Sequence, residues 1–395
     1  MRTTEDYAIE GYVAPGFEEV RQAFADGFSA GDELGAAFSA HLEGRKVVDI
    51  WGGRLRPGDP TPYDADTLQM VYSVTKGLTA VCLHMLVDRG LIDLDEPVVN
   101  WWPEFAQAGK QDVPVRWLLS HQVGLPTIDQ RLTPAQMLAG DPVADALAAQ
   151  APYWEPGTGY GYHALTFGWL VGEVFRRVEG RRVGRFLAEE IASPLGLDMW
   201  IGLPPELVGR VAPLNFDGPD MIEAPGVDQN SLMVRAGTLN GSVGALPHWV
   251  NDPATFVAEI PAGNGITNAR SLSRLYAAVI GPVEGGPDRA LLSPSRIEAA
   301  RRRLTSGPDL VFASGGVPVE IAIGEGFWVH GGDVFPFGGP QSFGHPGTSG
   351  ALGFADPEHV IACGYVTNTT SGAAGADPRS TRLVRAVYDA AGIAS

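Results

Sequence analysis

The chain has 395 residues, 45% of them hydrophobic, and a formal net charge of −18 at pH 7. This length and composition predict a globular protein that buries an ample core without disulfides, as two domains or as one with an insertion. The negative charge argues against nucleic-acid and anionic-membrane partners, because both surfaces would repel it. No apolar run reaches the length of a membrane span, and none of signal-peptide length follows Met1 to Asp6. We therefore expect a cytoplasmic protein.

The cysteines and histidines give no sign of a disulfide framework or of a metal site. Cys82 and Cys363 fall in apolar segments, which predicts buried, reduced thiols. The eight histidines show no ligand spacing such as His-x-x-x-His. We expect no metal and no cofactor.

The first half of the chain predicts sheet elements followed by helices. A helix is expected over residues 17–28, and a hairpin of strands over 36–42 and 46–51. From about residue 73 to 185, helical segments are broken by proline and glycine. After the helix that begins at Ser73, the expected helices are 115–120, 134–138, 143–150 and 165–178.

The second half is harder to assign until its end. Residues 194–268 are rich in proline, glycine and asparagine and have poor periodicity, which is compatible with pocket walls. A helix is expected over 271–279, strands over 350–355 and 360–367, and a closing helix over 379–391.

Sheet elements at both ends bracket the helical segments. We predict an α+β protein in which residues 1–68 plus 262–395 form a domain with a sheet built from both termini. Residues 69–261 are predicted to form an inserted, mostly helical domain.

Ser73-Val74-Thr75-Lys76 is the first candidate site, at the start of an expected amphipathic helix. This spacing puts both side chains on one helix face, about 5–6 Å apart at Cβ, so that a deprotonated Lys76 can take the Ser73 proton. Only three of the 28 basic residues are lysines, and arginine cannot act as a base. The alternative is a capped surface helix. Against it, the following apolar stripe predicts burial: Leu78, Val81, Cys82, Met85 and Leu86.

Two later segments supply further candidates. A glycine-rich loop contains Tyr160 and ends at Tyr162, and either phenol is a candidate proton carrier if a Lys76 ammonium lowers its pKa. Residues 344–350 are small and precede a strand, so an edge strand here can lie close to a substrate. The backbone N–H of Thr348, with that of Ser73, is a candidate oxyanion hole.

Together the three segments resemble the serine β-lactamase and penicillin-binding-protein superfamily, which combines Ser-x-x-Lys with Tyr-x-Asn and Lys-Thr-Gly elements. In that family the tyrosine follows a Pro-Gly pair at a fixed distance, and Pro156-Gly157 then selects Tyr162 over Tyr160. Segments 118–126 and 353–357 also match, so the resemblance extends from about residue 20 to 390. It implies a β-lactamase/DD-peptidase-like fold with an antiparallel sheet flanked by helices, and an active site at the interface of the two domains.

The chain departs from the family pattern at two positions that concern the substrate. Tyr162-His163-Ala164 lacks the asparagine that holds the substrate amide in β-lactamases, and His345-Pro346-Gly347 replaces the lysine that meets the substrate carboxylate. The chain is therefore similar to the class C β-lactamase-like carboxylesterases, or family VIII esterases, which are often cytoplasmic. This resemblance implies hydrolysis of a small-molecule, short-chain ester through an acyl-enzyme on Ser73. Lys76 and Tyr162 would carry protons, and which acts first is open.

The remaining expectations concern pocket residues and rival functions. Beside Ser73 and Thr348, the expected substrate-contacting and pocket residues are His345, Gly347, Trp154, Trp249, Phe335 and Phe337. The rivals are an acyltransferase using the same site, a weak β-lactamase or D-amino-acid peptidase, and a non-catalytic binding protein. An α/β-hydrolase nucleophile motif, Gly-x-Ser-x-Gly, fails at Ala351. The sequence leaves the oligomeric state open, a homo-oligomer included.

Overall fold

The computed structural model describes residues 8–216, 221–223, 225–244, 249–334, 338–370 and 377–393. Phe335 and Phe337, which were expected as pocket walls, lie outside the described residues.

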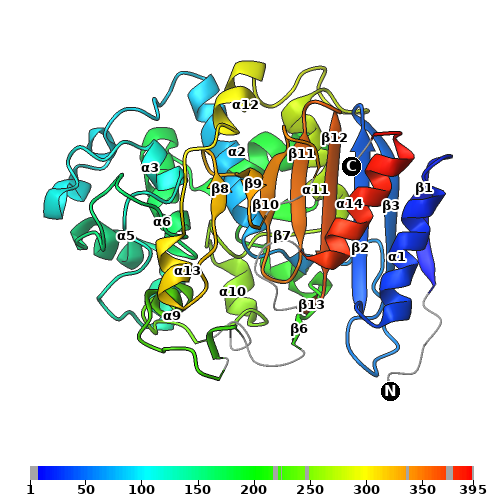
Figure 1. Ribbon diagram of the computed structural model, residues 1–395, viewed down its shortest axis with the longest axis horizontal. Coiled ribbons are helices and arrows are strands. Elements are labelled where there is room, and N and C mark those ends of the chain that lie inside the picture. Colours follow the sequence, from blue (N-terminus) through cyan, green and yellow to red (C-terminus); the bar gives the residue numbers. More distant parts are fainter. Residues whose placement is uncertain are drawn as a thin grey trace.

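An eight-stranded antiparallel sheet built from both ends of the chain is the centre of the fold (Figure 1). Its strand order is β1-β3-β2-β12-β11-β10-β9-β8. The strands are β1 (Ile9–Val13), β2 (Gly35–Leu42), β3 (Arg45–Gly53), β8 (Ile321–Ile323), β9 (Trp328–Gly332), β10 (Phe343–Pro346), β11 (Leu352–Asp356) and β12 (Ile361–Thr367). Because β2 pairs with β12, the N-terminal hairpin and the C-terminal strands close one sheet. The predicted α+β class with a flanked antiparallel sheet is confirmed.

Helices cover both faces of this sheet. Helices α1 (Glu18–Ala30) and α14 (Pro378–Ala390) lie side by side on one face (Figure 1), and α11 (Ala269–Ile280) packs on the other. Strand alternation explains the arrangement, because Phe38 and Tyr365 join the core under α1 and α14. On the opposite face, small residues such as Gly364 let α11 approach the strands closely.

The segment between β3 and α11 holds most of the α-helices of the described residues. Its α-helices are α2 (Val74–Asp88), α3 (Arg116–Leu119), α4 (Pro134–Ala139), α5 (Asp141–Ala149), α6 (Thr166–Glu179), α7 (Val183–Phe186), α8 (Ser193–Leu195), α9 (Leu232–Gly237) and α10 (Pro253–Val257). Its 3-10 and π-helical segments are η1 (Val98–Asn100), η2 (Pro103–Gly109), η3 (Leu187–Ala192), η4 (Pro205–Arg210) and η5 (Met221–Glu223). Two further helices, α12 (Pro294–Ala300) and α13 (Leu310–Ser314), follow α11. The division into two domains stays a prediction.

Short strands connect the two parts of the chain. Strands β4 (Gln69–Met70), β7 (Ile266–Thr267) and β5 (Met199–Trp200) form a three-stranded sheet, and β6 (Asn215–Phe216) pairs with β13 (Thr369–Thr370). The helices and strands named from the sequence are present, with ends shifted by at most two residues. Both cysteines are free and buried, as expected. Within the described ranges, no helix has the length and apolar character needed to cross a bilayer.

Helix α2 differs from the expected amphipathic helix, since all of its residues from Val74 to Leu86 are buried. The reason is that α2 is enclosed by β10 and β11 on one side and by α6 on another. Its polar side chains find partners inside the protein. Thr79 Oγ1 donates to the Pro261 carbonyl (2.7 Å), and His84 Nε2 lies 2.8 Å from the Glu325 carbonyl. Ser73 therefore begins a helix of the protein interior.

The segment that was expected as an edge strand lies inside the sheet as β10. The sequence pattern did not reveal β8 and β9, which add two short strands beyond it. Strand β9 pairs with β10 at Phe343 and Gly344, whereas β11 pairs with all four β10 residues. The expectation of an edge strand is therefore wrong, although the end of β10 that follows Gly344 is paired on one side within the described residues.

A side chain at position 364 should disturb the contact between α11 and the sheet. A Cβ atom on Gly364 would lie 2.4 Å from the Ala269 carbonyl oxygen and 2.7 Å from Leu272 Cβ. We expect Gly364→Val to lower the free energy of unfolding by about 1–3 kcal/mol or more, measured by denaturant titration. Gly209→Ala, where a Cβ meets nothing within 4 Å, should change it by less than about 0.5 kcal/mol. Unchanged stability of Gly364→Val would contradict this packing.

Candidate active site

Ser73 lies at the N-cap of α2, yet its hydroxyl does not cap the helix. Instead, Ser73 Oγ lies 3.1 Å from Lys76 Nζ. The preceding residue, Tyr72, has φ +48°, a left-handed conformation that costs an L-residue about 1–2 kcal/mol. Thr75 Oγ1 fixes this bend by donating to the Tyr72 carbonyl and accepting from the Gly265 N–H. The bend directs the serine hydroxyl toward the lysine, unlike a solvent-exposed helix cap.

The Lys76 amine is fully buried, and it forms no ion pair with a carboxylate in the part of the chain that the structure describes. Its Nζ lies 2.8 Å from the Ala164 carbonyl oxygen, 3.0 Å from the Ala262 carbonyl oxygen and 3.1 Å from Ser73 Oγ. Burial lowers the pKa of Lys76 well below its usual value. A neutral amine has two N–H donors and one lone pair. The two carbonyls accept the N–H groups, which leaves the lone pair for the Ser73 hydroxyl.

Tyr162 lies beside this pair, with its ring centroid 4.7 Å from Lys76 Nζ. Burial raises the pKa of the Tyr162 phenol, and a hydrogen bond with Ser73 only partly opposes that effect. The expectation that a Lys76 ammonium lowers this pKa is therefore wrong, because burial also disfavours the ammonium. The other candidate, Tyr160, is occupied elsewhere. Its hydroxyl donates to the Gly307 carbonyl (2.8 Å) and accepts from the Ile321 N–H (2.9 Å).

The turn between β10 and β11 brings Thr348 to the same cavity as Ser73. Gly347 makes this approach feasible, because a Cβ atom there would lie 2.4 Å from the Val71 carbonyl oxygen. Within the described residues, the backbone N–H groups of Ser73 and Thr348 donate no hydrogen bond. Two such amides at one cavity can stabilise a developing oxyanion.

Helix α14 anchors that turn from behind. Arg379 Nη2 donates to the Ser349 carbonyl (2.7 Å) and to Asp377 Oδ2 (2.7 Å). Arg379 Nη1 also lies 3.7 Å from Glu33 Oε2, and all three charged side chains are buried. Buried ion pairs of this kind hold a fixed geometry because losing one partner leaves an uncompensated charge. The residue next to Thr348 is therefore tied to the C-terminal helix.

The other expected contacts differ in position. Trp249 lines the cavity, whereas His345, Gly347 and Trp154 are absent from its described lining. The His345 ring lies behind Tyr162, 6.1 Å away between centroids, and burial lowers the pKa of His345 well below its usual value. Trp154 packs under the glycine-rich loop, where its Nε1 donates to the Gly159 carbonyl (3.2 Å). In the free protein, His345 is therefore an uncharged, buried side chain.

The cavity at Ser73 has a volume of about 120 Å³ and largely apolar walls. Its lining residues are Tyr72, Ser73, Tyr162, Ala164, Leu165, Ile222, Met233, Ala236, Gly237, Trp249, Gly263, Val311, Phe312 and Thr348. No charged side chain belongs to this described lining. Residues 194–268, whose composition was compatible with pocket walls, supply six of these lining residues: Ile222, Met233, Ala236, Gly237, Trp249 and Gly263. The wall from α13 was not expected, because the five residues of this helix show too little periodicity to be recognised.

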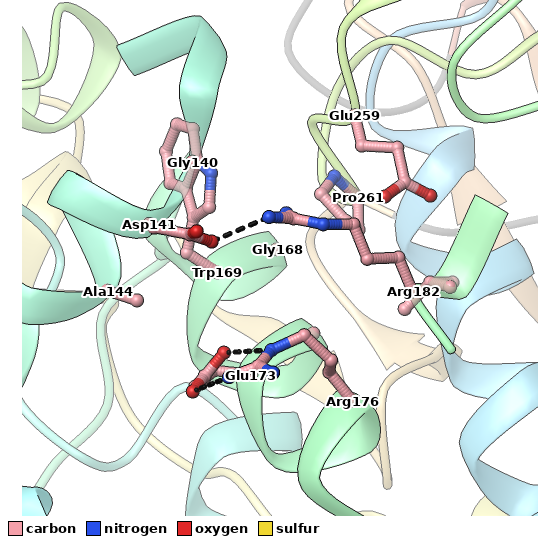
Figure 2. Close-up of a pocket in the computed structure, with 12 residues that line it drawn as sticks. Gly140, Asp141, Ala144, Gly168, Trp169, Glu173, Arg176, Arg182, Glu259 and Pro261 are labelled. Carbon is pink, nitrogen blue, oxygen red and sulfur yellow. Dashed lines mark hydrogen bonds and ion pairs between the residues drawn. The ribbon is translucent and has the colours of Figure 1, made fainter. Parts of the chain in front are cut away.

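Figure 2 shows a second cavity, lined by residues of α5, α6 and α7, which shares no lining residue with the first. Its volume of about 30 Å³ holds little more than a water molecule. Four of its charged side chains form two ion pairs, and Glu259 accepts the Gly184 N–H. Arg182 donates to Asp141 Oδ1 (2.6 Å), and Arg176 Nη2 to Glu173 Oε1 (2.7 Å). We assign this cavity no catalytic role.

The fold and the serine-lysine pair define a protein of the β-lactamase-like class. The sequence profile of the Beta-lactamase family matches residues 20–387, and the chain belongs to this family. The esterase/beta-lactamase LipL of Mycobacterium tuberculosis (strain ATCC 25618 / H37Rv) is 35% identical over 371 residues, which cover 91% of this chain and 83% of LipL.

Two solved structures are similar over almost the whole chain. A family VIII carboxylesterase is 37% identical with a TM-score of 0.87, and the match covers 97% of this chain and all of that one. A penicillin-binding-protein homologue from Caulobacter crescentus is also 37% identical, with a TM-score of 0.86 and the same coverage. The resemblance to the superfamily and to its esterase subgroup is confirmed.

Replacing Lys76 by arginine should remove the base, because a guanidinium is not deprotonated in proteins. We expect Lys76→Arg to slow labelling of Ser73 by a fluorophosphonate probe about 100-fold or more, measured by mass spectrometry over time. In the parent, the rate should fall as the pH drops through the lowered pKa of Lys76, because the amine then becomes protonated.

Lys110→Arg is a matched control for this experiment. Lys110 Nζ also donates to three backbone carbonyls, those of Gln107 (2.8 Å), Ala148 (3.0 Å) and Gln150 (2.6 Å). In Lys110→Arg, the fluorophosphonate probe should label Ser73 at the parental rate. Parental labelling of Lys76→Arg would rule out a lysine base.

Proposed function

We propose that this member of the β-lactamase family is a serine carboxylesterase that hydrolyses neutral esters with short acyl chains through an acyl-enzyme on Ser73. The observation that carries the proposal is the buried Lys76 amine, which pairs with no carboxylate among the described residues and lies 3.1 Å from Ser73 Oγ. Relatives and structural neighbours described as esterases support the same class of reaction.

Acylation begins when Ser73 Oγ attacks the ester carbonyl carbon and passes its proton to the Lys76 lone pair. The oxyanion of the tetrahedral intermediate accepts hydrogen bonds from the N–H groups of Ser73 and Thr348. The intermediate collapses by breaking its bond to the alkoxide, which takes a proton from the Tyr162 phenol. The Lys76 ammonium then returns its proton to Tyr162, which restores both neutral side chains. Lys76 is thus the first base in this proposal, and Tyr162 the proton donor.

Deacylation uses the same groups in the opposite direction. A water molecule attacks the acyl carbon and loses a proton to Lys76, through Tyr162 or directly. The same two amides bind the second oxyanion. When the bond to Ser73 Oγ breaks, Oγ takes back a proton, and the carboxylic acid leaves. Atoms and charge balance without a cofactor.

The walls of the site favour a neutral substrate. Ala164, at the position of the family asparagine, presents only a methyl group to the cavity. His345, at the position of the family lysine, is buried and uncharged. His163 is also occupied within the protein, since its Nε2 accepts from the Leu125 N–H (2.9 Å) and its Nδ1 lies 2.5 Å from the Gly161 carbonyl oxygen. A substrate carboxylate would therefore enter without a cation, which is costly.

The test is hydrolysis of p-nitrophenyl acetate, butyrate and octanoate beside nitrocefin. We expect the two short esters to react fastest and to yield free carboxylic acid, even with added alcohol. We expect kcat/KM for nitrocefin to be about 100-fold or more below that for p-nitrophenyl butyrate, because the nitrocefin carboxylate meets no cation in the described lining of the cavity. Ser73→Ala should lose about 1000-fold or more in kcat.

Ser29→Ala is the control, since Ser29 lies exposed on α1 and donates only to the Ala25 carbonyl. It should retain the parental rate. Parental activity of Ser73→Ala would contradict the acyl-enzyme on this serine. Equal turnover of nitrocefin and butyrate would contradict the neutral substrate class.

A further inference from the structure

Asp309 is a buried carboxylate that no cation pairs with in the described part of the chain. It accepts three backbone hydrogen bonds instead. Its Oδ2 accepts the N–H of Tyr162 (2.7 Å), and its Oδ1 accepts the N–H groups of Val311 and Phe312 (2.9 Å each). A carboxylate is expensive to bury, and these bonds stabilise it. The side chain thereby joins Tyr162 to a helix 147 residues away in the sequence.

That helix, α13, is also a wall of the catalytic cavity. Val311 and Phe312 line the cavity beside Tyr162. The Phe312 and Tyr162 rings stack with centroids 6.0 Å apart and an interplanar angle of 26°. The Leu310 N–H donates to the Tyr160 carbonyl (3.0 Å), which adds a backbone bond between the same two segments. The tyrosine loop and the cavity wall are therefore held together at several points, with Asp309 between them.

We propose that Asp309 is a positioning residue that places Tyr162 against Ser73 and α13 against the cavity at the same time. It touches neither the substrate nor the reacting atoms. Asp309 fixes the position of α13, the cavity wall that contacts the acyl group, relative to the Tyr162 phenol, which carries the proton. This inference rests on the proposed function, because it assigns Asp309 a task in the Ser73 reaction. Its sequence signal, an aspartate before a short helical segment, indicates only an N-cap.

The two oxygens of Asp309 accept different numbers of hydrogen bonds, one at Oδ2 and two at Oδ1. The hydrogen bond from the Tyr162 N–H to Oδ2 is therefore the more easily lost. A proton on Oδ2 breaks the single bond to Tyr162, whereas a proton on Oδ1 weakens both bonds to α13. The neutral acid should therefore release the Tyr162 amide and leave α13 capped.

Titration of this carboxyl falls in an accessible pH range. Burial raises the pKa of Asp309 to about 6, against the opposing effect of its backbone hydrogen bonds. The titratable groups that face it are the phenols of Tyr160 and Tyr162, and Glu320 and Arg303 lie next to Tyr160. Because protonation releases the Tyr162 amide, the reaction rate should fall as the pH drops through about 6.

Asp309→Asn tests this role. The asparagine Oδ1 still caps α13, but its NH2 group cannot accept from the Tyr162 N–H. We expect kcat for p-nitrophenyl butyrate to fall about 10-fold from the misplaced phenol, with KM nearly unchanged. The rate of fluorophosphonate labelling should fall by a similar factor, because the phenol also forms a hydrogen bond with Ser73 and orients its hydroxyl. The component of the acid limb near pH 6 should disappear. A merely structural role would lower stability without changing the shape of the pH profile.

Asp252→Asn is the matched control, because Asp252 caps another five-residue helix, α10, through the Ala254 N–H (2.9 Å). It should keep the parental kcat and pH profile. Thermal unfolding verifies that each variant is folded. If Asp309→Asn does not fold, Asp309→Ser, which also carries a capping side chain, takes its place with the same expected result.

A folded Asp309 variant with the parental labelling rate and acid limb would overturn the proposal. The labelling assay separates this failure from a failure of the proposed function. If the parent labels at Ser73 but hydrolyses no ester, the esterase function fails, and the labelling rates of the variants still decide the role of Asp309.

Discussion

The site depends on the burial of one lysine amine, that of Lys76, which no opposing charge of the described residues balances. Burying an unpaired ammonium inside a protein costs several kcal/mol, so the surroundings of Lys76 favour the neutral amine. Two carbonyls, of Ala164 and Ala262, come from segments 98 residues apart in the sequence and accept its N–H groups. The third neighbour is the Ser73 hydroxyl. The base is therefore prepared by burial, and the burial of α2 between the sheet and the helical segment produces it.

Close backbone contacts make this burial feasible. A Cβ atom at Gly77 would lie 2.2 Å from the Tyr276 hydroxyl oxygen, and one at Gly265 would lie 2.7 Å from Thr75 Oγ1. Glycine at these positions lets α2 sit against α11 and against the segment before β7. Gly347 does the same for the turn that carries Thr348. Ser73 with its own amide, the Tyr162 phenol and the Thr348 amide come from three separate parts of the chain, and these small residues allow them to share one cavity.

Local patterns predicted the parts of the site that depend on short spacing. The relation of Ser73 to Lys76 follows from helix geometry, and the longer helices and the N-terminal hairpin follow from periodicity. Strands β8 and β9 and helices α9 and α13 were missed, because their three to six residues show no clear periodicity. The similarly short α3 and α4 were located from the proline and glycine residues around them. The raised pKa of Tyr162 was also unpredictable, since it depends on burial by distant segments. Asp309 was missed for the same reason, because its bond to Tyr162 spans 147 residues.

The central claim is that Lys76 is a neutral amine at the pH of the reaction. The chain has only three lysines, so nitrogen-15 labelling of lysine gives three side-chain signals, and Lys76→Arg and Lys110→Arg assign two of them. A pH titration of these signals measures the Lys76 pKa directly. We expect a midpoint well below the usual lysine value of about 10.4, coincident with the part of the acid limb of Ser73 labelling that does not depend on Asp309. A Lys76 signal that stays charged up to the usual lysine value would contradict it.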